Sequence, residues 1–342
     1  MTPHNRVPDM RGNKVGNEQD QKQRTGVTVL LFDKPGVASG SFLGGAPALR
    51  ESALLEPEMV VEGIDAIVLS GGSTYGLDAT SGVQARLREV YSALPVADGK
   101  IRVPIVVQAS LFDLANGGNK DWGRYSPYAE MGYRAVMVAE TGPFSLGTVG
   151  AGTGATTATL RGGLGSASAI TPAGHTVSAI MAVNAVGTAT IGDGPHFWAA
   201  PFEQDHEFGG LGMPAHLTAQ DLKLRTKPDY VAGTSIGVIA TDAILSKSQT
   251  KRMAILAQDG VARGVYPAHL PEDGDAIFGV STQSAPAPAT PEEWREILHA
   301  ATQVTARAIA RAVYEAAALP GTHAFPTWQE RFGQRKENSE LP

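Results

Sequence analysis

A glycine followed by a threonine and an apolar run is the part of this chain whose residue types could do chemistry. The sequence runs Gly233-Thr234-Ser235 into the segment 236–240, and a β-branched run bounded by glycine predicts a buried strand. Thr234 would then lie at the strand's edge, where a sheet can present a side chain to a cleft. If the bond before Thr234 were cut, its α-amine would titrate at about pH 8 and could accept the hydroxyl proton. One residue would supply nucleophile and base, although most Gly-Thr pairs before a strand are simply turns.

Two carboxylates and one amide extend this candidate site. Asp273 and Asp275 flank a glycine just before a second apolar run, so a turn would place both acids at a strand entrance. One carboxylate can anchor and orient the ammonium or hydroxyl of an N-terminal threonine, although a turn also needs Asp and Gly for its own backbone. Asn184 ends another apolar run, where its amide could donate to a developing oxyanion or serve only as a strand-end turn residue.

Two glycine-rich segments are candidates for binding a substrate carbonyl. The run at 150–154 lacks the Lys-Ser/Thr ending of a Walker loop and the GxGxxG spacing of a dinucleotide fold, so a nucleotide site is not predicted. Backbone N–H groups in such segments can approach a substrate, or the glycines can merely let two sheets pack closely. The candidate residues are Gly72, Ser73, Tyr75, Gly152, Thr153 and Gly154.

Composition excludes several classes of partner. The 342 residues carry a net charge of -6 and no basic stripe, so neither nucleic acid nor an anionic membrane is expected to bind. The absence of cysteine excludes disulfides, thiolate metal sites and a cysteine nucleophile, and the histidines lack metal-ligand spacing, so no metal or cofactor is predicted. No stretch reaches transmembrane length and the first 24 residues lack an apolar signal core, which predicts a cytoplasmic protein.

The elements that must position these residues alternate between strands and helices. Residues 1–25 are polar and predict a flexible tail, and residues 26–330 predict one catalytic domain, with a surface linker at 283–290. Strands are expected at 27–32, 66–69, 105–108, 135–139, 176–184 and 235–240. Helices are expected around Val83, Leu87 and Val90, at about 246–264, and from a capping box of Thr290 and Glu293 to Pro320.

Several motifs, in register over residues 26 to about 319, resemble the L-aminopeptidase/D-esterase family, which includes the β-aminopeptidases and the nylon-oligomer hydrolase. The motifs are the strand 27–33, GGAP at 44–47 with Arg50-Glu51, SGGSTYGLDA at 70–79, GAGTGAT at 150–156, RGGLGSAS at 161–168, Asn184, PFE at 201–203 and Gly233-Thr234 before IGVIATDA. The resemblance implies a four-layer αββα sandwich similar to that of N-terminal-nucleophile hydrolases. It also implies self-cleavage between Gly233 and Thr234 into chains 1–233 and 234–342.

The resemblance assigns a role to each residue of the candidate site. Thr234 matches the nucleophile, Asn184 the oxyanion amide, and Asp273 with Asp275 the acid pair beside the nucleophile. A threonine with two aspartates is similar to the nylon-oligomer hydrolase branch.

Two positions depart from the family pattern. Relatives often carry a lysine where this chain has Thr159, and Arg161 is the nearest cation in the sequence. Some relatives place a tyrosine hydroxyl near the oxyanion where this chain has Phe112, which cannot donate a hydrogen bond. The resemblance therefore leaves oxyanion stabilisation to Asn184 and to backbone amides.

The implied activity is hydrolysis of amide or ester bonds in small peptides or aminoacyl amides, with 6-aminohexanoate oligomers among the substrates. The implied assembly is a homotetramer of cut protomers. Two alternatives remain open from the residues. An acyltransferase of the ornithine acetyltransferase type would pass the same acyl group to an amine instead of water, and an unprocessed binding protein would hold a small metabolite in the glycine-rich cleft without turnover.

Overall fold

The computed structural model describes residue 5 and residues 12–90, 94–96, 101–228, 232–321 and 325–333. Within these residues one mixed sheet of nine strands dominates the fold, and a separate hairpin pairs β5 (Leu94–Val96) with β6 (Ile101–Val103). The strands of the main sheet are β1 (Asn13–Asp20), β2 (Thr25–Phe42), β3 (Ala48–Arg50), β4 (Gly63–Ser70), β7 (Val106–Ser110), β8 (Gly163–Ile170), β9 (Thr176–Asn184), β10 (Thr234–Ala243) and β11 (Ala276–Ala285). Their order is β3-β7-β4-β2-β11-β10-β9-β8, with β1 also paired to β2.

The long strand β2 belongs to both halves of this sheet. Its first half pairs with β1 and β4, its second half pairs with β11, and its register with β4 shifts between Leu31 and Gly36. Such a bulge bends a strand and increases its twist. The sheet therefore divides into one layer around β1, β4 and β7 and a second layer of β8 to β11.

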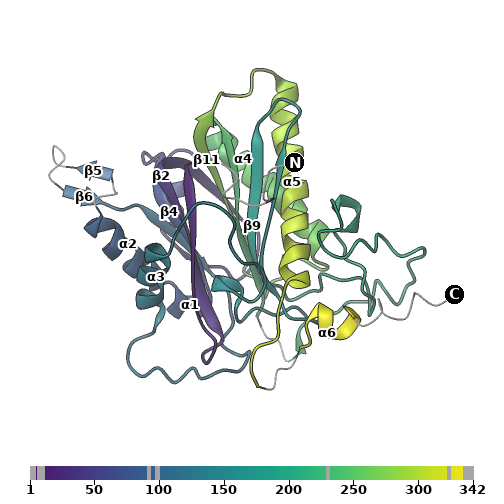
Figure 1. The fold of residues 1–342 in the computed structure, drawn as a ribbon. Helices are drawn as coiled ribbons and strands as arrows, with labels where there is room; N and C mark the ends of the chain where they lie inside the picture. Colours follow the sequence, from purple (N-terminus) through teal and green to yellow (C-terminus); the bar gives the residue numbers. More distant parts are fainter. Residues whose placement is uncertain are drawn as a thin grey trace.

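Three buried clusters show that helices cover both outer faces of the two sheet layers. The helices are α2 (Ala79–Glu89) and α3 (Tyr128–Met137) on one side, and α4 (Lys247–Gly264) and α5 (Pro291–Tyr314) on the other (Figure 1). Alternate residues of β2 face different clusters, since Val29 packs toward α2 and α3 whereas Leu30 packs between the sheet layers. A third cluster joins Ile239 of β10 to Val304 of α5. The order of layers is αββα, as predicted.

The prediction of a flexible tail over residues 1–25 is wrong for residues 13–20, which form a strand. Residues 13–20 form β1 and pair with β2 along their whole length, from Asn13 opposite Phe32 to Asp20 opposite Thr25. Its sequence is mostly polar, so the ladder with β2 stabilises this strand and hydrophobic periodicity does not reveal it. Residues 1–4 and 6–11 of the predicted tail lie outside the described residues.

Several other elements differ from those predicted from the sequence. The predicted strand at 135–139 is wrong, because Ala135 and Val136 belong to α3 and pack with Met131 into the buried cluster between α3 and the sheet. Strand β2 continues through the expected turn at 33–36, β11 extends into the expected linker, and α5 ends at Tyr314. The strands at 176–184 and 235–240 and the helix at about 246–264 are confirmed.

Helices α2 and α3 cross at two glycines. A Cβ atom on Gly82 would lie 1.7 Å from the Ala129 carbonyl oxygen, and one on Gly132 would lie 2.2 Å from the Ala79 carbonyl oxygen. The absence of a side chain at both positions lets the two backbones approach and seals the outer face of the first sheet layer.

We expect Gly82→Ala to lower the free energy of unfolding by about 1–3 kcal/mol, because the helices must separate to admit the methyl group. The better helix propensity of alanine, worth about 1 kcal/mol, offsets only part of this cost. Urea unfolding measures the effect, with Arg88→Ala on the exposed face of α2 as the control, which should change stability by less than about 0.5 kcal/mol. Equal stability of the two variants would contradict the tight crossing.

Candidate active site

Thr234 is the first residue of β10 and is 4% exposed. Strand β10 lies between antiparallel β9 and parallel β11, so its start is held from both sides. Thr234 lies directly opposite Asn184 of β9, and Gly233 forms a bridge with Asp273 at the entrance to β11. The sheet thus brings together the threonine, the amide and the acid pair that the sequence singled out.

The carbonyl oxygen of Gly233 accepts two hydrogen bonds that bear on the chemistry of the site. The Thr234 hydroxyl donates a hydrogen bond to this carbonyl oxygen. The backbone N–H of Gly274 donates to the same oxygen over 3.0 Å. A hydroxyl group therefore lies against the carbonyl of the preceding residue, and a fixed backbone donor is already placed where negative charge would develop if that carbonyl were attacked.

Glycine is required on both sides of this contact. A Cβ atom on Gly233 would lie 2.2 Å from the backbone nitrogen of Val186. A Cβ atom on Gly274 would lie 2.9 Å from the Thr234 hydroxyl oxygen. Because neither position has room for a side chain, two backbone segments can enclose the threonine directly.

Asp273 binds backbone on two sides of the site. Its Oδ1 accepts a hydrogen bond of 3.1 Å from the Val186 N–H, and its Oδ2 accepts one of 3.1 Å from the Leu270 N–H. Burial, followed by the negative charge of Asp275, raises the pKa of the Asp273 carboxyl to about 6. In the single uncut chain this carboxyl therefore holds the loop before β11 against the end of β9.

Asp275 pairs with a histidine that the sequence did not single out. Its Oδ1 accepts a hydrogen bond of 2.7 Å from the Ser235 N–H, next to Thr234. Its Oδ2 accepts from the His269 N–H over 3.1 Å and lies 2.8 Å from His269 Nδ1. Burial lowers the pKa of His269, but the hydrogen bond and charge of Asp275 outweigh it and raise that pKa overall. His269 has a φ of +59°, so no helical or strand periodicity could have revealed it.

The amide of Asn184 is held in one orientation. Its Nδ2 donates to the Phe112 carbonyl oxygen over 2.7 Å, and its Oδ1 accepts from the Thr156 N–H over 3.0 Å. Phe112 thus contributes its backbone carbonyl to the site. Only one of the two amide N–H groups of Asn184 takes part in a hydrogen bond within the described residues, which leaves the other free to donate.

The cation that contacts Asn184 is Lys227, whereas Arg161, the cation nearest to Thr159 in the sequence, binds elsewhere. Lys227 is 6% exposed, and its Nζ donates to both the carbonyl oxygen and Oδ1 of Asn184, each over 2.9 Å. Burial lowers the pKa of Lys227 to about 7, against the opposing charges of Asp273 and Asp113. Arg161 instead donates to the Thr153 carbonyl oxygen over 2.9 Å. Lys227 lies in a polar loop without periodicity, so only the tertiary structure reveals it.

The glycine-rich segment at 150–154 forms a buried turn, η3 (Gly150–Gly152). The N–H of Gly152 donates to the Val149 carbonyl over 2.9 Å, and the N–H of Thr153 donates to the Gly150 carbonyl over 3.1 Å. A Cβ on Gly152 would lie 2.1 Å from the Leu164 nitrogen, and one on Gly154 would lie 2.1 Å from the Arg24 carbonyl oxygen. These contacts favour the close-packing interpretation over the substrate-binding one.

The segment at 72–75 contacts the chain beside Phe112. The Gly72 N–H donates to Asp113 Oδ1 over 2.8 Å, and the Ser73 N–H donates to the Leu111 carbonyl over 2.9 Å. Tyr75 is 55% exposed and helps to line an open cavity of about 470 Å³ with Leu114, Lys120, Trp122 and other residues of the loop 120–126. Gly72 and Ser73 therefore support the segment that binds Asn184, whereas Tyr75 faces outward.

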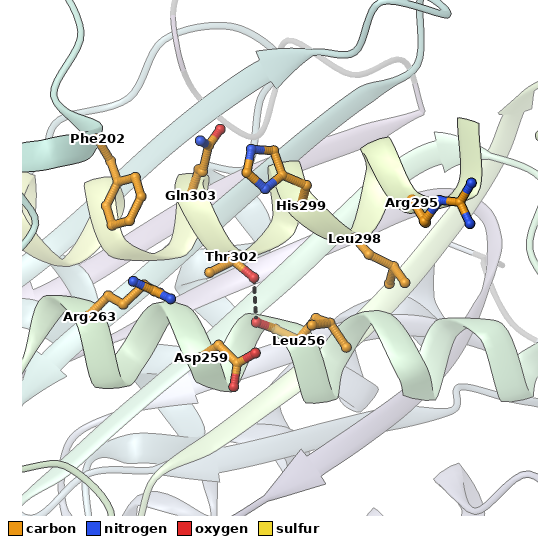
Figure 2. Close-up of a pocket in the computed structure, with 9 residues that line it drawn as sticks. All are labelled: Phe202, Leu256, Asp259, Arg263, Arg295, Leu298, His299, Thr302 and Gln303. Carbon is orange, nitrogen blue, oxygen red and sulfur yellow. Dashed lines mark hydrogen bonds between the residues drawn. The ribbon is translucent and has the colours of Figure 1, made fainter. Parts of the chain in front are cut away.

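A second pocket lies between α4 and α5 in the outer helix layer (Figure 2). It encloses about 450 Å³ and includes Phe202, Leu256 and Leu298, and Thr302 Oγ1 donates across it to the Leu256 carbonyl over 2.9 Å. Neither Thr234 nor the acid pair is among the residues that line this pocket.

Two other kinds of site are absent from the described residues. They contain no group of three or more histidine, aspartate or glutamate side chains placed to hold a metal ion. None of their helices combines the length and apolar character that a membrane span requires.

Comparison with known proteins places the chain in a family. Residues 5–325 match the profile of a family described as peptidase family S58. The chain is 36% identical over 353 residues to an uncharacterised aminopeptidase of Mycobacterium leprae, covering 95% of this chain and 94% of that protein. It is 26% identical over 292 residues to a 6-aminohexanoate-oligomer endohydrolase of Kocuria sp., covering 83% of this chain and 76% of that protein.

The fold matches a solved structure over nearly its whole length. The L-aminopeptidase D-Ala-esterase/amidase of Ochrobactrum anthropi superposes with a TM-score of 0.71 at 21% identity, covering 98% of this chain and 94% of the other. That structure is described as a new variant of the Ntn hydrolase fold. The four-layer sandwich of this chain is the same variant.

The lowered pKa of Lys227 predicts how stability depends on pH. The pKa is about 7 in the folded chain and about 10.4 in the unfolded chain, so between these values the unfolded state binds the extra proton. Stability contributed by Lys227 is therefore lowest below pH 7 and rises as the pH increases above it.

We expect Thr234→Ala to gain about 2 kcal/mol in unfolding free energy between pH 7 and pH 9, relative to Thr234→Ala/Lys227→Met. Both proteins carry Thr234→Ala, so the comparison reports the lysine alone. Urea unfolding at both pH values measures the difference. An identical pH dependence in the two proteins would contradict the lowered pKa of Lys227.

Proposed function

Because the chain belongs to peptidase family S58, we propose that it is an amide hydrolase that cuts itself before Thr234 and then uses Thr234 as its N-terminal nucleophile. The arrangement at one carbonyl group carries this proposal. The Thr234 hydroxyl and the Gly274 N–H both bind the Gly233 carbonyl oxygen, one as the attacking group and the other as a donor for the oxyanion.

Self-cleavage would proceed in two steps. Thr234 Oγ1 forms a bond to the Gly233 carbonyl carbon and loses its proton, and the Gly274 N–H stabilises the resulting oxyanion. The bond to the Thr234 nitrogen then breaks, the nitrogen takes up a proton, and an ester joins Gly233 to the threonine oxygen. Water hydrolyses this ester, which leaves a carboxylate on Gly233 and a free amine on Thr234.

Turnover would repeat the same chemistry on a substrate. The new α-amine of Thr234 accepts the hydroxyl proton, and Oγ1 attacks the substrate carbonyl. The free N–H of Asn184 is the side-chain donor for the oxyanion, and removing one such donor from an enzyme typically costs about 2.7–4 kcal/mol of transition-state stabilisation. The leaving amine takes the proton, and water releases the acyl group. Asp273 and Asp275, which bind backbone on either side, are placed to receive the ammonium of cut Thr234.

Relatives suggest the substrate class. Identity is 36% to a mycobacterial aminopeptidase and 26% to a 6-aminohexanoate-oligomer endohydrolase. We therefore propose small peptides or aminoacyl amides with a free N-terminus as the substrates to test first, and 6-aminohexanoate oligomers second. A homotetramer of cut protomers remains our prediction for the assembly. Acyl transfer to ornithine in place of hydrolysis would favour the acyltransferase alternative.

The nucleophile is tested by intact mass spectrometry of the purified protein and two variants. Wild type should give two fragments, the second starting at Thr234, and Thr234→Ala should give one folded, uncut and inactive chain. Ser235→Ala is the matched control, because Ser235 is the neighbouring buried hydroxyl and its Oγ has no hydrogen-bond partner among the described residues. It should still be cut before Thr234.

Cleavage of Thr234→Ala at the same bond would contradict the proposal. One uncut chain in wild type would also contradict it and would favour the unprocessed binding protein.

A further inference from the structure

Self-cleavage needs help that the threonine itself cannot give. Before cleavage the nitrogen of Thr234 is part of a peptide bond, so it is neither a base nor a cation. Groups from other segments must therefore prepare the oxyanion site in the uncut chain. Resting on the function proposed above, we infer that Lys227 is the positioning residue that fixes the Asn184 amide opposite Thr234 for both self-cleavage and turnover.

The contacts of Lys227 determine the orientation of the Asn184 side-chain amide, that is, where its Oδ1 and Nδ2 point. Its Nζ donates to the backbone carbonyl oxygen and to Oδ1 of Asn184, each over 2.9 Å, so one ammonium group bridges two oxygens of one residue. The Thr156 N–H also donates to Oδ1. A flipped amide would place its NH₂ group against two donors, so these contacts keep Nδ2 on the side of the Phe112 carbonyl and of the site.

The backbone around Lys227 is tied to the same site. The Lys227 N–H donates to the Val186 carbonyl over 3.0 Å, and the Val186 N–H donates to Asp273 over 3.1 Å. The short segment from Asn184 to Val186 therefore contacts both the lysine and Asp273, and its first residue lies opposite Thr234. Displacement of Lys227 would therefore also shift Asn184, the residue opposite Thr234.

The positive charge of Lys227 also affects the hydrogen bonds that Asn184 can donate. A hydrogen bond from a charged donor is stronger than one from a neutral donor, and a chain of such bonds polarises its members. A cation on Oδ1 therefore makes the opposite N–H groups of Asn184 better donors to an oxyanion. This role differs from that of a lysine that only satisfies buried carbonyls.

The chain contains a lysine of that second kind, which serves as a control. Lys247 is 7% exposed, close to the 6% of Lys227. Its Nζ donates to three backbone carbonyls, those of Leu54, Met59 and Val61, and to no residue of the candidate site. Lys247→Met and Lys227→Met thus remove the same group from positions of similar solvent exposure, and only one of them removes a contact with Asn184.

The test follows self-cleavage, which needs no added substrate. Each protein is made by cell-free synthesis, and intact mass spectrometry measures the uncut fraction over time. We expect Lys227→Met to slow cleavage at least about 10-fold, because Asn184, which lies opposite Thr234, loses its fixed orientation. Lys247→Met should cleave at the wild-type rate. Lys227→Gln, which keeps a donor and loses the charge, should lie between wild type and Lys227→Met.

A second measurement separates positioning from loss of structure. With alanine p-nitroanilide as the probe, the cut Lys227→Gln enzyme should lose kcat while KM stays within about twofold, since the amide acts on the transition state. Near-ultraviolet circular dichroism reports whether each variant is folded. If Lys227→Met does not fold, the cleavage rate of Lys227→Gln decides the question.

The outcomes distinguish this inference from the proposed function. Wild-type cleavage rates in folded Lys227→Met or Lys227→Gln would overturn the role of Lys227 while leaving Thr234 as the nucleophile. Equal slowing by Lys227→Met and Lys247→Met would also overturn it, because the effect would then follow from buried lysines in general. A wild-type chain that is never cut would overturn the proposed function itself.

Discussion

The hydrogen-bonded ladder that holds β10 between β9 and β11 is the constraint on which the candidate site depends. The site is built at the point where this ladder starts, so two neighbouring strands fix the first residue of β10. Because β9 runs antiparallel to β10, its last residue, Asn184, lies opposite Thr234. Because β11 runs parallel, the residues that enter it lie beside Gly233. Topology alone therefore gathers residues that are far apart along the chain.

Close backbone approach is the second requirement, and it explains the two glycines beside Thr234. Side chains at Gly233 or Gly274 would collide with the backbone of Val186 or with the Thr234 hydroxyl. Their absence lets a backbone N–H reach the carbonyl that the threonine would attack. A backbone donor held by a sheet needs no reorganisation during reaction, which is the property that makes such donors effective.

Charges in this site are buried, and each is held by several hydrogen bonds. Lys227 and Asp273 have pKa values moved toward neutrality by burial, to about 7 and about 6, so both sit near the point where protons are exchanged at physiological pH. The hydrogen bond from Asn184 to the Phe112 carbonyl joins the two sheet layers. Asn184 ends β9 in the second layer, and Phe112 follows β7 in the first layer. The four-layer sandwich thus places the site where its two sheet layers meet, with helices covering both outer faces.

The sequence alone determined the strand that follows Thr234, the strand that ends at Asn184, the acidic turn before β11 and the family resemblance that implied the sandwich. These follow from apolar runs and turn residues, which are local. Only the tertiary structure revealed Lys227, which lies in a polar loop, and His269, whose left-handed backbone has no periodic signal. It also decided that residues 13–20 form a strand, since a polar segment pairs with β2 through backbone hydrogen bonds that any side chain permits. Contacts between distant segments depend on how the layers pack, and the side-chain pattern within one segment does not predict this packing.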